Sequence, residues 1–283
     1  PMKPRRRCLF PTQIEREYQR QVRGIAYLIA SAYDAALADV YGQAIAMRAA
    51  RLDETAPVSG WAAVFVRAIE RATTNTDKLL TEAFQLVRRF SGRTDAFHKR
   101  QFMQMIRATY GVDIFKSEPW LENELGAWEA ENIALIKSVG EQAKASMHGS
   151  YIRAVKDGRS LRDVKSSVKA LYGVSDKRAE LIARDQIGKL NGQLTAIRQQ
   201  AIGVEKYTWK SMDDSRVRPS HQDYDGQTFK WSEPPPEGHP GQPIRCRCYA
   251  APVLPAFNDI KGVIVSQEHV RKAAKESFYD YAL

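Results

Sequence analysis

The stretch YTWKSMDDSRVRPSHQDYDGQTFKWSEPPPEGHPGQPIRCRCYAAP, residues 207–252, differs in composition from the rest of the chain. It contains two of the five histidines, two of the three cysteines and two of the five tryptophans. Its run of prolines at 234–236 excludes a helix interior or a central strand there, because proline has no backbone N–H to donate. We therefore expect a small irregular module whose histidine, cysteine and aspartate side chains form either a site or a set of internal contacts.

Three short segments of this stretch have the character of β-strands. Residues 207–211 alternate aromatic and polar side chains, which is the period of a strand. Residues 228–231 would form a second strand, reached through the turn Asp225-Gly226. Residues 245–250 would form a third. We predict a short irregular β-sheet after residue 203.

Before residue 203, apolar residues recur at the spacing of three and four that is typical of amphipathic helices. Gly92 and the two Tyr-Gly-Val sequences at 110–112 and 172–174 are expected to end helices, because glycine readily adopts the left-handed conformation that follows a last helical turn. The predicted fold is therefore mainly α with a small α+β C-terminal module, and its long helices pack together. The predicted helices span about 12–51, 61–91, 95–109, 119–157, 160–172 and 175–202.

These patterns also divide the chain into parts. The predicted parts, in chain order, are a flexible basic arm (1–11), an N-terminal helical region (12–118), a domain with a helical half (119–203) and a small β module (204–255), and a C-terminal tail with an amphipathic helix (256–283).

The chain is basic, with 43 lysines and arginines against 33 acidic residues and a formal net charge of +10. Two interpretations stay open, a solvated basic surface and contact with a polyanion such as nucleic acid. Arg5, Arg6 and Arg7 are the candidate nucleic-acid contacts. No apolar run approaches the roughly 18 to 20 residues that span a bilayer, and no signal-peptide pattern follows the basic start. We expect a cytoplasmic, reducing setting and no membrane partner.

The two neighbouring cysteines are candidate metal ligands. On a strand, Cys246 and Cys248 would project from the same face, and the arginines beside them from the other. With His221 and His239 they supply two thiols and two imidazoles, a donor set suited to tetrahedral zinc. The single residue between the cysteines is fewer than the two to four that are usual in structural zinc sites. The alternative is a packed module whose thiols are buried and whose histidines hydrogen-bond to the backbone.

The aspartates of the stretch have two open roles. Asp213, Asp214 or Asp223 could replace a histidine as an oxygen ligand. Aspartate could also form bidentate pairs with the arginines that follow it, as internal staples of a domain too small to hold much core. The residues expected to act as staples or to meet a partner are Asp214, Arg216, Arg218, Trp209 and Arg247.

A catalytic site is a further alternative to the metal site and to the internal staples. A cysteine nucleophile could use His221 as its base and an aspartate to orient the imidazole. The sequence shows no recognised nucleophile turn, phosphate-binding loop, dinucleotide fingerprint or paired metal carboxylates. We therefore predict that the chain is not an enzyme and retain a cysteine or metal-dependent hydrolase as the alternative.

The unusual residues of the stretch occur in a characteristic order: Trp209, Asp214, Arg216-Val217-Arg218, His221, Asp225-Gly226, His239-Pro240-Gly241 and Cys246-Arg247-Cys248. In this order they resemble the C-terminal signature of the phage Mu F-like family, the minor capsid or head morphogenesis proteins of tailed phages and prophages. The segment 179–184 that leads to Gly203-Val204 resembles the helical half of the same domain. The resemblance covers about residues 125–254, and residues 1–118 add nothing to it.

The resemblance implies a virion component, present in few copies, at the portal vertex and the capsid interior. It implies a part in head assembly in the host cytoplasm, with portal protein and major capsid or scaffold proteins as partners and packaged double-stranded DNA as a further candidate. Metal binding by the histidine and cysteine positions is suspected for the family too. Two other classes stay open, a virion-associated hydrolase and a non-specific DNA-binding protein.

Overall fold

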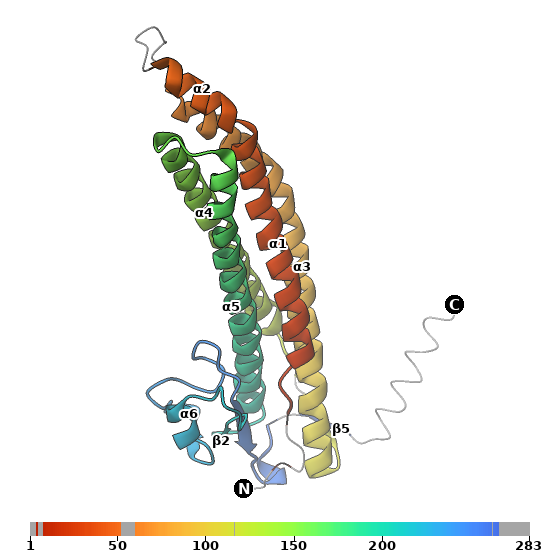
Figure 1. Ribbon diagram of the computed structural model, residues 1–283. Helices are drawn as coiled ribbons and strands as arrows, with labels where there is room; N and C mark the ends of the chain where they lie inside the picture. Colours follow the sequence, from red (N-terminus) through yellow and green to blue (C-terminus); the bar gives the residue numbers. More distant parts are fainter. Residues whose placement is uncertain (1–3, 5–7, 52–59, 116, 262, 266–283) are drawn as a thin grey trace, which may run out of the picture. The chain divides into compact units, whose positions relative to one another are not determined.

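The computed structural model describes residues 4, 8–51, 60–115, 117–261 and 263–265. Long helices dominate, and the short strands follow mostly at the C-terminal end (Figure 1), so the predicted fold class is confirmed. The elements are α1 (Thr12–Asp39), α2 (Tyr41–Arg51), α3 (Ala62–Tyr110), β1 (Asp113–Phe115), α4 (Leu121–Lys156), α5 (Leu161–Ala201), β2 (Lys206–Lys210), α6 (Pro219–Asp223), β3 (Thr228–Lys230), β4 (Tyr249–Val253), the 3-10 helix η1 (Phe257–Asp259) and β5 (Val263–Val265).

The chain forms two compact units, each made of separate segments of sequence. Unit 1 comprises Pro1–Glu15, Ser91–Gly126 and Asp185–Leu283, and unit 2 comprises Arg16–Phe90 and Ala127–Arg184. Each unit therefore takes residues from both sides of the predicted division at residue 118. The predicted arginine contacts 5–7 and the predicted helix of the C-terminal tail lie outside the described residues.

Two of the predicted helix ends are wrong. α3 continues through Gly92 and α5 continues through Gly173, and neither glycine has a positive φ. A glycine inside a helix costs about 1 kcal/mol relative to alanine, an amount that the packing of a long helix offsets. Gly111, at φ 77°, follows the end of α3 as predicted. Conversely, the predicted first helix is interrupted at Val40, between α1 and α2.

The described residues of unit 2 form helices and the short connections between them, and its core is formed by the apolar faces that the spacing predicted. Leu37, Phe65 and Met147 are completely buried there. The core also holds a polar contact, because the carboxylate of Asp34 accepts hydrogen bonds from the hydroxyls of Tyr151 (2.7 Å) and Tyr172 (3.1 Å). These contacts satisfy hydroxyl groups that would otherwise be costly to bury.

The sheet of unit 1 is antiparallel, with β2 between β3 and β4. Tyr207 and Trp209 of β2 are fully buried, while Thr208 between them is only partly so, and this confirms the period of two. β1 pairs separately with β5, also antiparallel, with Ile114 opposite Ile264.

The predicted third strand, 245–250, begins later than expected, because β4 spans Tyr249–Val253. Arg245 has a φ of 60°, and the backbone N–H of Cys246 donates to the carbonyl of Pro243 at 3.0 Å. Residues 243–246 therefore form a turn instead of extended chain.

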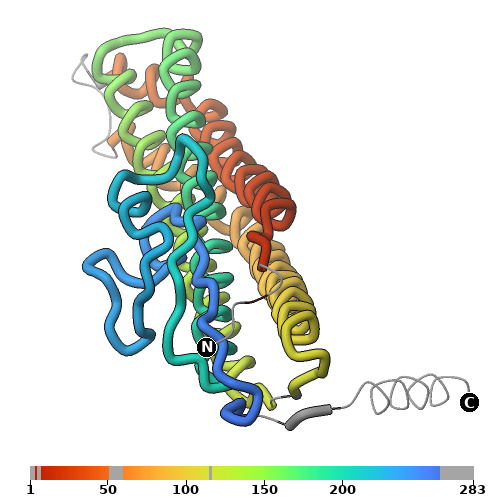
Figure 2. The backbone as a smooth tube through the Cα atoms, turned by 90° about the horizontal axis from the view of Figure 1, so that it is seen from below, coloured from red at the N-terminus to blue at the C-terminus, as the bar shows by residue number. Residues whose placement is uncertain are grey.

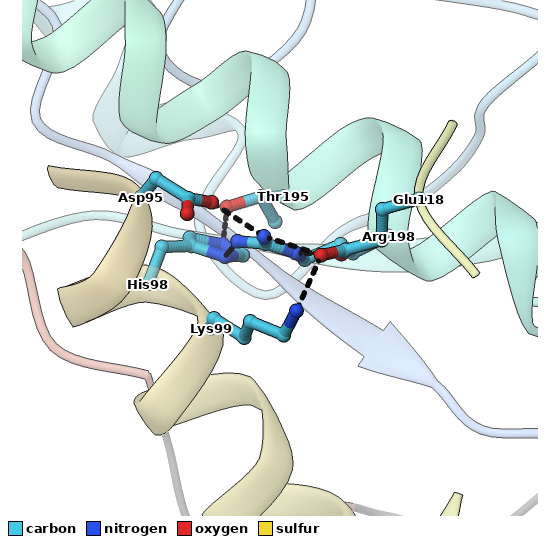
Figure 3. A network of polar contacts seen from close by, with 6 residues as sticks. All are labelled: Asp95, His98, Lys99, Glu118, Thr195 and Arg198. Carbon is cyan, nitrogen blue, oxygen red and sulfur yellow. Dashed lines mark hydrogen bonds and ion pairs between the residues drawn. The ribbon is translucent and has the colours of Figure 1, made fainter. Parts of the chain in front are cut away.

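An ionic network centred on the buried Arg198 joins α3, α5 and the segment before α4 within unit 1 (Figure 3). The guanidinium of Arg198, 3% exposed, contacts Asp95 at 2.5 Å and Glu118 at 2.6 Å. Lys99 adds a second cation to Glu118 at 2.9 Å. Since the carboxylates match the cations in number, the network neutralises itself and holds these segments together.

His98 completes this network and has a definite tautomer. Its Nδ1 lies 2.9 Å from a guanidinium nitrogen of Arg198, and its Nε2 lies 2.9 Å from the hydroxyl of Thr195. Because arginine can only donate, Nδ1 accepts and Nε2 carries the proton, which it donates to Thr195. Burial, and then the charge of Arg198, lower the pKa of His98 to about 3. His98 is therefore neutral in the folded protein.

Candidate metal centre

Three of the four predicted metal ligands lie together in unit 1. His221 lies in α6, and Cys246 and Cys248 precede β4. The Nδ1 atom of His221 is 3.7 Å from the Sγ of Cys246 and 3.5 Å from the Sγ of Cys248. All three donor atoms lie within 4.8 Å of one another, and all three residues are buried. The cysteines meet the histidine from a turn, although the sequence suggested a strand.

Local contacts hold the segment with the two cysteines (residues 240–248, the cysteine loop) in this position. The guanidinium of Arg218, just before α6, donates to the carbonyl of Ile244 at 2.6 Å. The backbone N–H of Arg245 donates to the carboxylate of Asp185 at 2.9 Å, and that of Gly241 donates to the Sγ of Cys246 at 3.4 Å. The loop is thus tied to the start of α6 and to α5.

Two glycines of α5 permit this loop to approach the helix backbone, beside which it runs (Figures 1 and 2). A Cβ atom at Gly192 would lie 2.7 Å from the carbonyl oxygen of Pro240, and one at Gly188 would lie 3.0 Å from that of Cys246. Gly241, at φ 93°, approaches Gly192 from the loop side. The position of Cys246 therefore depends on the absence of side chains at both places.

The electrostatics of the cluster favour the thiolate form of Cys246. A hydrogen bond from the Cys248 thiol, and then the contact with His221, lower the pKa of Cys246. The pKa of Cys248 is raised because it is the donor of that hydrogen bond and is buried. The hydrogen bond to Cys246 raises the pKa of His221. A thiolate is the form of cysteine that binds a metal.

The second ring nitrogen of His221 is also held. Its Nε2 lies 3.1 Å from a carboxylate oxygen of Glu237. A carboxylate at the nitrogen that does not bind metal is the usual companion of a metal-binding histidine, because it fixes the ring and its tautomer. Two thiols and one oriented imidazole fit zinc by their chemistry.

His239, the predicted fourth ligand, lies elsewhere in unit 1. Its Nδ1 is 2.8 Å from the hydroxyl of Tyr207, and its ring is 4.8 Å from that of Trp231. It belongs to the aromatic core of the sheet. Among the residues that the structure describes, none of the candidate aspartates Asp213, Asp214 and Asp223 belongs to the cluster. A zinc ion here would have three protein ligands and a fourth position for water or another group.

Comparison with known proteins supports the resemblance found in the sequence. Residues 145–251 match the family model described as Phage Mu protein F like protein. These residues are a Mu F-like domain. The matched range contains α6, the cysteine loop and therefore the whole thiol–imidazole cluster.

A protein of Haemophilus influenzae, described as an uncharacterized protein, is 31% identical over 230 residues, which cover 78% of this chain and 52% of that protein. The chain thus spans about half the length of the curated relative it matches. No solved structure matches significantly. Among the helices that the structure describes, none is long and apolar enough to span a membrane.

The predicted staple residues of the Mu F-like domain mostly contact one another. Asp214 accepts hydrogen bonds from the guanidinium of Arg247 at 2.7 Å and from that of Arg216 at 3.0 Å. These contacts, chiefly the one with Arg247, lower the pKa of Asp214 to about 2. Arg218 does not pair with an aspartate but supports the cysteine loop, as described above. Trp209 is fully buried, and its ring centre is 5.1 Å from that of His221.

Three contributors to the site were not predicted from the sequence. Glu237 stands among prolines and carries no motif, so only the fold reveals that it meets His221. The spacing of Gly188 and Gly192 could have predicted their role, because two glycines four residues apart on one helix face allow another backbone to approach closely.

Proposed function

We propose that this protein is a structural component of head morphogenesis in a tailed phage or prophage, acting at the portal vertex and the capsid interior. The observation that carries the proposal is the Mu F-like domain at residues 145–251. The buried thiol–imidazole cluster of that domain is consistent with a structural part, because its side chains are 2–7% exposed.

In this proposal the domain folds around zinc held by His221, Cys246 and Cys248. Bound zinc would cross-link α6 to the cysteine loop. Such a cross-link contributes directly to folding free energy, because the unfolded chain has no preformed site. Glu237 orients the imidazole, and Gly188 and Gly192 give the loop its place on α5.

The partners in this proposal are portal protein and major capsid or scaffold proteins, and the +10 charge favours a contact with packaged double-stranded DNA as well. The direct test is genetic. In a phage or prophage that carries this gene, a deletion should reduce the yield of DNA-filled heads, and the restored protein should co-purify with portal protein. Normal heads with normal DNA content in the deletion strain would contradict the proposal.

A second candidate, a cysteine hydrolase, is favoured by one observation, the short distance between Cys246 and His221. Against it stands the burial of Cys246, which is 5% exposed. Labelling with an electrophilic thiol probe at neutral pH separates the two. A structural centre predicts no selective labelling of Cys246 or Cys248. Selective labelling that His221→Ala abolishes would instead favour catalysis.

A further inference from the structure

Four arginines gather around one small cavity beside the candidate metal centre. The cavity has a volume of about 240 Å³ and is bounded on one side by the thiols and the imidazole of the cluster. Arg216 and Arg218 reach it from the segment before α6, and Arg245 and Arg247 reach it from the cysteine loop. Segments that are about thirty residues apart in sequence thus bring their cations to one place.

The positive charge of this cavity is only partly balanced. Asp214 is the single carboxylate in contact with these guanidinium groups in the described part of the chain, and Arg216 and Arg247 share it. Arg218 donates to the neutral carbonyl of Ile244. The guanidinium of Arg245 makes no hydrogen bond or ion pair with any residue that the structure describes. Four guanidinium groups therefore have one hydrogen-bonded carboxylate among them, that of Asp214.

The nearest other carboxylates have partners of their own. Asp185 accepts the backbone N–H of Arg245 and contacts the ammonium of Lys189 at 2.9 Å. Glu237 contacts His221 at the ring nitrogen that faces away from the thiols, and it also interacts electrostatically with Arg218. Two carboxylates, Asp214 and Glu237, thus stand against four guanidinium groups. The excess positive charge around the cavity therefore remains available to a ligand.

The backbone conformation of Arg245 also indicates a ligand-binding position. Its φ of 60° lies in the left-handed region, which long side chains adopt rarely because of steric conflict with their own backbone. Residues held in such conformations by their surroundings are concentrated at ligand-binding positions. Here the hydrogen bond from the backbone of Arg245 to Asp185 holds the conformation.

We propose that this cavity binds a phosphate group, with Arg218 and Arg245 as its principal contacts. The planar guanidinium group offers paired N–H donors that match the oxygens of a phosphate. The cavity is smaller than the pockets that take drug-sized ligands, which begin at about 300 Å³, so its size suits a single phosphate group better than a whole nucleotide. The excess positive charge, the type of donor group and the size of the cavity therefore agree.

The phosphate could belong to a DNA backbone or to a small phosphate ester. The first source rests on the proposed contact with packaged DNA and would give that contact a defined residue set. The second does not rest on it. The site itself stands on the arginines in either case.

The primary test is calorimetric titration of the full chain with inorganic phosphate at constant ionic strength. Wild-type protein should bind phosphate at one saturable site. Arg218→Gln combined with Arg245→Gln should weaken binding roughly tenfold or more, because two charge-assisted contacts are lost. The matched control is Arg67→Gln with Arg71→Gln on the exposed face of α3, which removes the same charge elsewhere and should bind like wild type.

A second arm identifies the source of the phosphate. A short DNA duplex should compete with inorganic phosphate, and the dependence of log affinity on log salt should be lower by about one in the double variant, as expected for one lost phosphate contact. Failure of the duplex to compete would assign the site to a small phosphate ester, with the site itself upheld.

Equal phosphate binding by wild type and the pocket variant, or no saturable binding by wild type, would overturn the proposal. Should the double variant fold poorly, Arg245→Gln alone decides the question, because that guanidinium supports no other described residue, and it should still weaken binding. The head-yield experiment is independent of this titration. Phosphate binding together with normal heads in the deletion strain would mean that the proposed function alone had failed. Reduced head yield in that strain with no phosphate binding by the chain would mean that the phosphate site alone had failed.

Discussion

The Nε2 atom of His221 lies 3.1 Å from a carboxylate oxygen of Glu237, and this contact leaves Nδ1 free to face the two cysteine thiols. The residues are 16 positions apart, on either side of the proline run. The pairing resembles the support that a metal-binding histidine receives from its surroundings, and it makes Glu237 a positioning residue.

The first prediction concerns that carboxylate. Glu237→Gln should weaken zinc binding about 10- to 100-fold, the usual effect of removing such a support, as measured by competition with a chromogenic chelator. Glu233→Gln is the control, because Glu233 is exposed in the same loop and contacts only Lys230 among the described residues. Equal zinc affinity in the two variants would remove the positioning role of Glu237.

The second prediction concerns the approach of the cysteine loop to α5. In Gly192→Ala the new Cβ would lie 2.7 Å from the carbonyl oxygen of Pro240, and backbone must move to relieve the contact. We expect a loss of about 1–3 kcal/mol in the free energy of unfolding, measured by chemical denaturation.

The control for that substitution is on the same helix. A Cβ at Gly173 would meet no atom within 4 Å, so Gly173→Ala should stabilise the protein by about 0.5–1 kcal/mol through helix propensity. Similar effects of the two substitutions would mean that the loop does not depend on Gly192.

The third prediction concerns pH. The pKa of His98 is lowered to about 3 by burial and by Arg198, whereas an unfolded histidine titrates near 6.5. Between these two pKa values His98 is protonated in the unfolded chain and neutral in the folded protein. The contribution of His98 is therefore complete above about pH 6.5 and is lost as the pH falls towards 3, by at most about 1.4 kcal/mol per pH unit.

Denaturation midpoints measured from pH 7.5 to 4 check this contribution. His98→Gln should flatten the dependence, because an amide can accept from Arg198 without a titration of its own. A wild-type slope that the substitution leaves unchanged would assign the pH dependence to other groups.

The sequence predicted those features that depend on local pattern. The alternation at 207–211 predicted β2, because a strand with one buried face repeats every two residues. The apolar spacing predicted the long helices. The helix ends predicted at Gly92 and Gly173 were wrong. A glycine indicates a possible helix end, but the packing of the whole helix decides whether the helix ends there.

The donor residues of the candidate site could be predicted from the sequence. Which of them lie together could be predicted only in part. Two thiols and a histidine could be read from the sequence as metal donors, and the fold brings His221 to both cysteines. His239 has the same donor chemistry, yet its Nδ1 is hydrogen-bonded to the hydroxyl of Tyr207 in β2, and it is not part of the cluster. Such long-range contacts leave no periodic pattern in the amino-acid sequence. The same is true of Glu237 and of the turn at Arg245.

The most direct test of the structural role of the cluster is the zinc content of the purified full chain by mass spectrometry, combined with its melting temperature. We expect about one zinc per chain. Cys246→Ser with Cys248→Ser should lose the zinc and several degrees of melting temperature, while Cys8→Ser should retain the zinc. A zinc-free wild-type protein, or a double variant with unchanged zinc content and melting temperature, would contradict this expectation.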